Sequence, residues 1–291
     1  MIPSAFEYYA PDTLEEAISL LNEHGDQAKV LAGGHSIIPL MRFRFATPTH
    51  IIDINKIGDL NYIKESNGNL LIGAMTREIE LEQSDLIKSK YPLLLDTTLT
   101  IGDRQIRNMA TVGGNLAHGD PANDHPATMI AFGAEIVATG KDGERTIPVD
   151  DFFKGLLTTA LKPDEILTEI RIPAAENNSG GAYEKIKRKA GDFAVAAVAV
   201  QLTLDDSGKC TKAGIGLTNV GPMPIRASDA QKALEGHKID DGVIAEAAAK
   251  ASEACSPSSD LRGPKEYKVA MIKELTKRAI GRALERTGGG R

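Results

Sequence analysis

The sequence predicts an α+β protein built from two domains. Its 291 residues exceed what a single hydrophobic core usually serves. Ahead of Pro173 the strand and helix patterns are mixed, whereas beyond Gly181 three strand patterns are followed by three helix patterns. The stretch between them, residues 173–181, is rich in Asn, Gly and Ser and is predicted to be a linker.

The N-terminal part is predicted to open as a βαβ-like unit. Apolar residues of 12–24 fall on one helical face, Thr13 and Glu16 fit a capping box, and Gly25 ends the helix. Two short apolar runs are predicted to be strands, 28–31 and 51–54. Further along, strands are predicted over 69–74, 134–139 and 165–172. Helices are predicted over 76–81 with Thr76 as cap, 93–99 and 126–132.

The C-terminal part is predicted to be a three-stranded meander packed by helices. Turn signals at Gly191-Asp192 and 206–208 separate the three strands. The strands are expected at 183–189, 194–204 and 212–218, and the helices at 228–235, 241–254 and 266–286. The glycine-rich tail, 288–291, is expected to be disordered.

Composition and charge exclude several classes of function. The net charge of −6 argues against a nucleic-acid partner, which would require a basic face. No apolar run approaches the roughly 18 residues that span a membrane, and the N-terminus lacks the features of a secretory signal, so a cytoplasmic location is expected. Cys210 and Cys255 are too few to ligate an iron–sulfur cluster, which takes four protein ligands.

Two double-glycine segments are candidate ligand-binding loops. Ala32-Gly33-Gly34-His35-Ser36 follows a predicted strand, and Thr111-Val112-Gly113-Gly114-Asn115 has a polar residue after its glycines. Glycines let main-chain N–H groups approach phosphate oxygens closely. Either segment alone is more typical of a tight turn, but two of them in one domain could clamp a dinucleotide. The fingerprints of nicotinamide Rossmann domains and P-loop ATPases are absent, because Gly214-Ile215-Gly216 has the wrong spacing and lies in a strand pattern.

Two further motifs carry polar chemistry. His118 to Pro126 contains two His and two Asp, which suggests a metal site, an Asp that accepts hydrogen bonds from ligand hydroxyls, or a structural turn. Gly119 and Pro121 break a helix there, so the ligand-hydroxyl interpretation is favoured over a metal. On the strand 183–189, alternation puts Lys185, Lys187 and Lys189 on one face, which is usually a solvated face.

Taken together, these motifs resemble a known family, the FAD-binding medium subunits of molybdenum hydroxylases. The chain is most similar to the medium subunit of aerobic carbon-monoxide dehydrogenase. The resemblance runs from Ile2 to about Thr287. It rests on five motifs in order and spacing: AGGHS at 32–36, ATVGGN at 110–115, GDPANDHPA at 119–127, DEILTEIRIP at 164–173 and YEKIKRKAGDFA at 183–194.

The resemblance implies a fold and a set of FAD-binding residues. The fold is a two-part FAD domain of the vanillyl-alcohol-oxidase (PCMH) type over 1–176, with sub-domains of about 1–55 and 56–176, followed by an α+β domain over 177–287. The residues expected at the cofactor are Ala32, Gly33, Gly34, His35 and Ser36 at the pyrophosphate, Thr111, Val112, Gly113, Gly114 and Asn115 at the phosphate and ribityl region, Asp124 at the ribityl chain, Ile101 and Leu167 as apolar contacts, and Lys185 near the flavin ring. Phe193 stands where the carbon-monoxide enzyme carries a tyrosine.

The resemblance also implies that the reaction is divided among three different chains. One partner is expected to carry the molybdenum cofactor and to oxidise the substrate, and a small partner to carry two [2Fe–2S] clusters. This chain would take electrons from the clusters and pass them to a quinone or another acceptor. It needs no catalytic residue or metal of its own. The complex is expected to be a dimer of heterotrimers, with contact to the inner face of the membrane through the complex.

The sequence leaves open which substrate the complex oxidises and whether the chain is a subunit or an enzyme that works alone. His35 and the stretch IGLTNVGPMPI favour the carbon-monoxide type, while aldehyde, nicotine-type and purine-type hydroxylases are alternatives. A stand-alone flavin oxidase is a further alternative, although 4% aromatic residues and the lack of Trp argue against a substrate pocket over the ring. FAD is expected to be non-covalent. Lys185 is expected to tune the flavin and to contribute little to stability.

Overall fold

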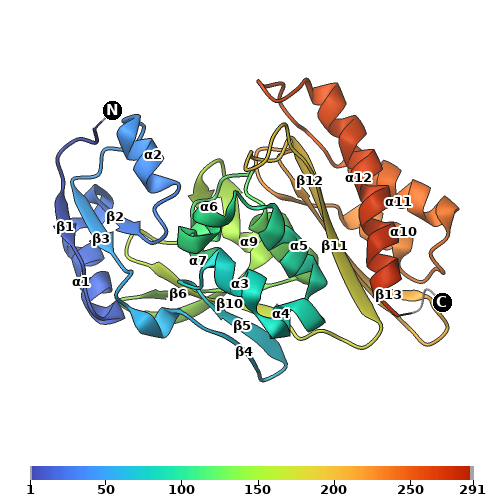
Figure 1. Ribbon diagram of the computed structural model, residues 1–291, viewed down its shortest axis with the longest axis horizontal. Helices are drawn as coiled ribbons and strands as arrows, with labels where there is room; N and C mark the ends of the chain where they lie inside the picture. Colours follow the sequence, from blue (N-terminus) through green and yellow to red (C-terminus); the bar gives the residue numbers. More distant parts are fainter. Residues whose placement is uncertain (1, 289–291) are drawn as a thin grey trace.

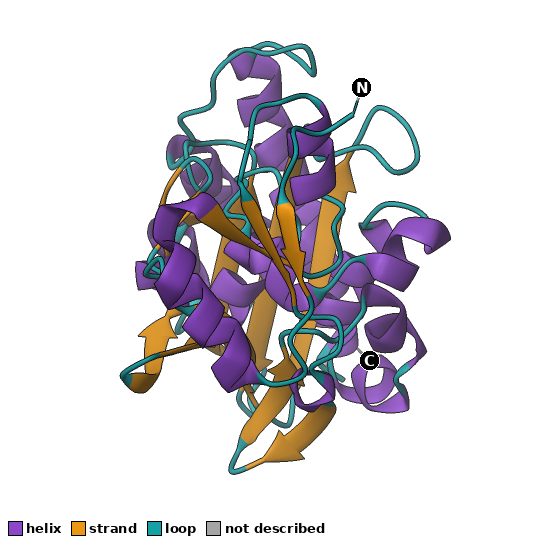
Figure 2. Cartoon of the chain, turned by 90° about the vertical axis from the view of Figure 1, so that its left-hand side faces the viewer, coloured by secondary structure: helices purple, strands orange, loops and turns teal. Residues whose placement is uncertain are grey.

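The computed structural model describes residues 2–288. It has three larger sheets side by side and a separate two-stranded sheet, with helices on both sides of the strands (Figures 1 and 2). In Figure 1 the first sheet lies at the left, the second in the centre and the third at the right, following the chain from blue to red. No helix of residues 2–288 has both the length and the apolar surface needed to cross a membrane.

The first sheet is parallel and has three strands in the order β1-β3-β2. Its strands are β1 (Glu7–Tyr9), β2 (Ala28–Leu31) and β3 (His50–Asp53). Helix α1 (Leu14–His24) connects β1 to β2 and buries Ala17, Ile18 and Leu21 against the sheet. The Thr13 hydroxyl accepts the Glu16 N–H at 3.2 Å, so the N-cap half of the predicted capping box is confirmed. The Glu16 carboxylate accepts the Asp12 N–H, and not that of Thr13, so the reciprocal half was wrong.

The second sheet is antiparallel and has five strands in the order β4-β5-β10-β6-β7. These are β4 (Ile63–Ser66), β5 (Asn69–Gly73), β6 (Glu135–Gly140), β7 (Gly143–Pro148) and β10 (Ile166–Pro173). Its helices are α3 (Glu78–Gln83), α4 (Asp85–Lys90), α5 (Pro92–Thr100), α6 (Arg104–Met109), α7 (Val112–Ala117), α8 (His125–Phe132) and α9 (Val149–Phe152). The elements of this half of the chain that belong to neither sheet's layer of helices are η1 (Gly25–Gln27), α2 (Ile37–Arg42), η2 (Gly58–Leu60) and the hairpin of β8 (Phe153–Gly155) and β9 (Thr158–Thr159).

The third sheet is an antiparallel meander between two layers of helices. Its elements are β11 (Ser179–Ile186), β12 (Ala196–Leu204), β13 (Cys210–Thr218), β14 (Ile225–Arg226), α10 (Ser228–Leu234), α11 (Asp241–Glu253) and α12 (Lys265–Arg286). Side chains alternate along β12: Ala197 and Ala199 join the core that includes α8, whereas Val198 joins the core that includes α12. A single sheet therefore joins the two halves of the chain.

Glycines in β13 explain why helix α8 packs so closely on this sheet. A Cβ at Gly214 would lie 1.8 Å from the Ala131 carbonyl oxygen, and a Cβ at Gly216 would lie 2.0 Å from that of Ala127. The Gly-x-Gly pattern is thus a packing feature of a strand, in agreement with its rejection as a nucleotide-binding fingerprint.

The structure confirms the α+β class and the C-terminal meander, and it corrects several local predictions. The linker is shorter than predicted, because β10 continues to Pro173 and β11 begins at Ser179. Thr76 does not cap a helix, because its hydroxyl bonds the main chain of Tyr62 and the helix begins at Glu78. The expected disordered tail lies outside the described residues except for Gly288.

Candidate functional site

The two double-glycine segments meet where the first sheet adjoins the second. A Cβ at Gly33 would lie 2.4 Å from the main-chain oxygen of Met109 and 2.8 Å from the Cα of Ala110. A Cβ at Gly114 would lie 3.8 Å from the Ala32 Cβ. The segments lie about 80 positions apart in the sequence, yet the residues directly before the second segment pack against Gly33, where only glycine fits.

The first segment is a turn between β2 and α2. Gly34 has a φ of +78°, a conformation that residues with a side chain rarely adopt. His35 is exposed, and Ser36 precedes α2 without making a capping hydrogen bond to that helix. The Ser36 hydroxyl is therefore not used by a cap, whereas the Ile38 N–H of α2 already donates to the Gly34 carbonyl at 3.1 Å.

The second segment was predicted to be a loop, and this prediction was wrong. Its glycines lie in the first turn of α7, because the Thr111 hydroxyl accepts the Gly114 N–H at 3.1 Å and caps the helix. Gly113 donates to the Ala74 carbonyl at 3.0 Å, and a Cβ there would lie 2.6 Å from the Ala74 Cβ. Val112 is fully buried in the core and its N–H donates to the Thr76 carbonyl at 3.0 Å, so this residue anchors the segment to the second sheet.

Asn115 and Asp124 extend this surface along the chain. The Asn115 Oδ1 atom is buried and has no hydrogen-bond partner within residues 2–288. Its main-chain oxygen accepts the Asn123 side-chain amide at 2.7 Å, which holds the second segment next to Asp124. A buried acceptor of this kind suits a ligand hydroxyl.

Asp124 is the centre of a buried polar cluster. Its Oδ2 lies 2.7 Å from the Lys185 Nζ, and its Oδ1 accepts the Tyr183 hydroxyl at 2.6 Å. Asp124 occupies the N-cap position of α8 but makes no capping bond, because both oxygens are used by the third sheet. Burial, reinforced by the Asp124 carboxylate, raises the pKa of Tyr183 well above its ordinary value.

The lysine predictions need correction at this cluster. The strand ends at Ile186, so Lys187 and Lys189 do not continue the alternation. The Lys185 side chain is only 2% exposed, which excludes a solvated face. Because it neutralises a buried carboxylate, we no longer expect its removal to leave stability unchanged.

The remaining predicted residues lie in different surroundings. Ile101 is buried beside Thr100, whose carbonyl oxygen is 3.4 Å from the Lys185 Nζ. Leu167 is a core residue of β10. Phe193 is 44% exposed, and the Arg262 guanidinium lies 5.5 Å from the centre of its ring.

The glycine segments and the Asp124 cluster form two ends of one extended region. Helix α6 leads from the loop after Ile101 to Met109 and Ala110, which pack on Gly33. Six helical residues span about 9 Å.

Sequence reasoning missed two side chains that hold this region together. Arg77 donates to the carbonyl oxygen of Met109 and to the Asn55 Oδ1. The Asn55 amide donates to the Ala32 carbonyl at 3.0 Å. No local motif marks either residue, since their partners are distant in the sequence.

The His and Asp residues of 118–126 have separate partners. His125 contacts Glu78 in the interior, while Asp120 accepts the Ala122 N–H. Burial lowers the pKa of His118, with Asp120 opposing the shift. Within residues 2–288 no group of three or more His, Cys, Asp or Glu is arranged to hold a metal ion.

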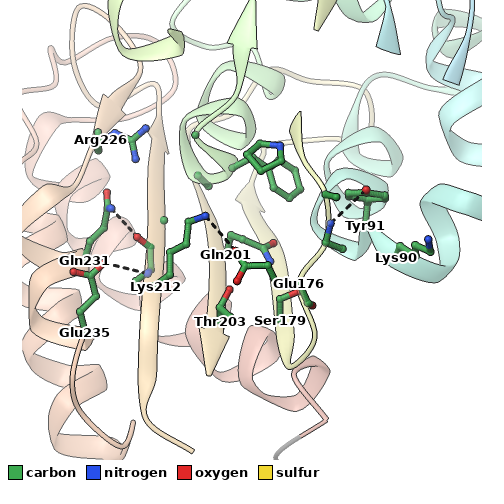
Figure 3. A pocket seen from close by; sticks show the side chains of 18 residues that line it. Lys90, Tyr91, Glu176, Ser179, Gln201, Thr203, Lys212, Arg226, Gln231 and Glu235 are labelled. Carbon is green, nitrogen blue, oxygen red and sulfur yellow. Dashed lines mark hydrogen bonds and ion pairs between the residues drawn. The ribbon is translucent and has the colours of Figure 1, made fainter. Parts of the chain in front are cut away.

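A separate pocket of about 260 Å³ lies between the second and third sheets (Figure 3). None of the predicted site residues lines it. Its Lys212 pairs with Glu176 at 3.4 Å, and its Tyr91 hydroxyl is used by Glu65. The pocket's charged groups are thus engaged within the chain.

Comparisons with known proteins give matches over nearly the whole chain. Residues 4–175 match the FAD binding domain in molybdopterin dehydrogenase, and residues 181–283 match the CO dehydrogenase flavoprotein C-terminal domain. The chain is 46% identical to the carbon monoxide dehydrogenase medium chain of Afipia carboxidovorans, covering 98% of this chain and 99% of that one. It is 37% identical to the glyceraldehyde dehydrogenase medium chain of Sulfolobus acidocaldarius, covering 96% and 99%.

A solved structure gives the same similarity in three dimensions. Carbon monoxide dehydrogenase from Hydrogenophaga pseudoflava, in a form lacking the Mo-pyranopterin moiety of its molybdenum cofactor, superposes with a TM-score of 0.96. The sequence identity is 46%, and the match covers 98% of this chain and 99% of that one.

Proposed function

The chain belongs to the family of FAD-binding subunits of molybdopterin dehydrogenases, and from this premise we propose that it is the flavoprotein subunit of an aerobic carbon-monoxide-oxidising complex. The observation that carries the proposal is the 46% identity to a carbon monoxide dehydrogenase medium chain over nearly the full length of both chains. The identity to the glyceraldehyde enzyme's medium chain is lower, at 37%.

We propose that FAD binds along the region between the glycine segments and the Asp124 cluster. Ala32 to Ser36 would bind the pyrophosphate with main-chain N–H groups and the Ser36 hydroxyl. Thr111 to Asn115 would line the phosphates and the ribityl chain, with the unpartnered Asn115 Oδ1 as an acceptor. Bound FAD supplies the electron carrier of the complex.

At the other end of the region, charged and apolar side chains would surround the ring system. Asp124 would accept hydrogen bonds from ribityl hydroxyls. Lys185 would hold a positive charge close to the ring, in a setting from which water is largely excluded. Ile101 and Leu167 would supply apolar contacts, and Phe193 would lie at the outer face of the ring.

The remaining assignments concern domains, partners and location. We propose a FAD-binding domain over 1–176, with sub-domains of about 1–55 and 56–176, and a C-terminal domain over 177–287. The partners would be a large molybdenum-cofactor subunit and a small [2Fe–2S] subunit in a dimer of heterotrimers, with a quinone as acceptor. Two cysteines on this chain support the location of cluster ligands elsewhere. The complex would lie in the cytoplasm, at the inner face of the membrane.

The experiment that tests this function is purification of the tagged chain from its native host. We expect a large and a small chain to co-elute, molybdenum and acid-labile sulfide to be present, and the complex to reduce a dye with carbon monoxide. The isolated chain should show no turnover. Turnover by the isolated chain, or elution without partners, would contradict the proposal.

A further inference from the structure

A buried pair of polar side chains, His125 and Glu78, has no role in the function described so far. The His125 Nε2 lies 3.0 and 2.9 Å from the two carboxylate oxygens of Glu78, and both side chains are completely buried. Because the carboxylate is an acceptor, Nε2 carries the proton. The His125 Nδ1 is buried and unpartnered within residues 2–288.

The contact between His125 and Glu78 links the neighbourhood of Asp124 to that of the second glycine segment. Glu78 is the first residue of α3, and its N–H donates to the Ala110 carbonyl at 3.0 Å, next to the second glycine segment. The preceding residue, Arg77, forms a β-bridge with Thr111 and donates to the Asn55 Oδ1, and the Asn55 amide donates to the Ala32 carbonyl of the first segment. His125 directly follows Asp124 in the chain.

Stability alone does not account for such a pair. Exchange of a buried ion pair for well-packed apolar residues is often neutral or stabilising, because burial of charge costs more than the contact returns. The neighbouring Ala127 and Met129 of α8 are fully buried and apolar, so an apolar pair would suit this environment. A directional contact to both carboxylate oxygens instead fixes one orientation of α8's first residue.

We propose that the His125–Glu78 pair is a positioning element that holds Asp124 at a fixed distance from the glycine segments, an inference that rests on the proposed FAD site. Neither residue touches the cofactor in this account. The pair sets where the Asp124 carboxylate, and with it the Lys185 ammonium, stands relative to the segments that bind the phosphates.

The test separates positioning from stability with a double variant, His125→Leu with Glu78→Met, in the full chain. Removal of both partners leaves no unpaired charge, so its thermal midpoint should equal or exceed that of the wild type. Its Kd for FAD should rise about tenfold, and the visible circular dichroism of the bound flavin should change. The single variant His125→Gln, which keeps an N–H donor, should bind FAD within about twofold of wild type.

A matched control lies in the same core at the other end of α8, where Tyr91 packs against Phe132, the last residue of that helix. The Tyr91 side chain is 1% exposed, and its hydroxyl donates to Glu65 at 2.8 Å. Tyr91→Phe should lower the thermal midpoint slightly and leave the Kd for FAD and the flavin spectrum unchanged.

The outcomes distinguish the two proposals. A double variant with wild-type affinity and spectrum would overturn the positioning role and leave the FAD site intact. A wild-type chain that binds no FAD would instead contradict the proposed function. If the double variant does not fold, Glu78→Met alone decides, because a neutral His125 then leaves no buried charge. FAD binding about tenfold weaker in Glu78→Met, with His125→Gln still within about twofold of wild type, supports positioning, and wild-type affinity with an unaltered spectrum in Glu78→Met overturns it.

Discussion

The two ends of the candidate site are built in different ways. At the glycine end, main chains touch: the Met109 carbonyl and the Ala110 Cα occupy the space that a Cβ of Gly33 would need. At the Asp124 end, charged side chains from distant elements meet, as Lys185 and Tyr183 do on one carboxylate. The first end depends on small residues, and the second depends on charge. Substitutions should therefore affect the two ends through different physical effects.

The largest effect is expected for Gly33→Val. The new Cβ would meet backbone atoms that cannot rotate away, so the first sheet must shift from the second. We expect a loss of about 3 kcal/mol in the free energy of unfolding and complete loss of bound flavin. Denaturant unfolding and the flavin absorbance of the purified protein measure both. A folded variant with full flavin content would show that the segments need not touch.

Gly114→Val should also abolish flavin binding, at a smaller cost in stability. Its Cβ would lie 2.6 Å from the Thr111 hydroxyl, so the N-cap of α7 is lost at a cost of about 1 kcal/mol. Cys210→Ser is the control, because Cys210 lies in the core of the third sheet, away from the site. Equal flavin content in Gly114→Val and wild type would refute the assignment of the second segment.

Lys185→Met tests the charged end. Removal of one partner leaves the buried Asp124 without its counter-charge, which costs about 3 kcal/mol. The flavin midpoint potential should fall by tens of millivolts, since about 1.4 kcal/mol corresponds to about 30 mV for a two-electron couple. Dye equilibration on the FAD-loaded variant gives the potential. An unchanged potential together with reduced stability would make Lys185 a structural residue only.

The smallest effect is expected for the dependence of stability on alkaline pH, through Tyr183. The pKa of Tyr183 is raised in the folded chain by burial and by Asp124, so the neutral phenol is the form that folding favours. This contribution to stability is fully present below about pH 10, the ordinary pKa of tyrosine, and is lost as pH rises beyond it. In Tyr183→Phe, the free energy of unfolding should therefore fall less steeply as pH rises above about 10. Identical unfolding curves for variant and wild type above pH 10 would contradict this assignment.

The glycine end could be predicted from the sequence because its signals are local. Two double-glycine segments in one domain indicated a site of close approach, and five motifs in register supported the family, which the comparisons confirm. The helical start at Val112 was missed, because two glycines weaken any helix pattern and only the Thr111 cap favours it.

The charged end could not be predicted in the same way. Lys185 and Asp124 are 61 positions apart, and His125 and Glu78 are 47 apart. Such contacts depend on how three sheets pack together, which no periodicity reveals. Lysine alternation alone suggested a solvated face, whereas the strand pairing with β12 turns Lys185 toward the interior.

The most direct test of the central claim is a crystal structure of the full chain loaded with FAD. We predict that the pyrophosphate oxygens lie about 3 Å from main-chain N–H groups of residues 33–36, with residues 111–115 lining the phosphates and Asp124 at the ribityl chain. A pyrophosphate bound elsewhere, such as at Lys212 in the pocket between the second and third sheets, would contradict the claim.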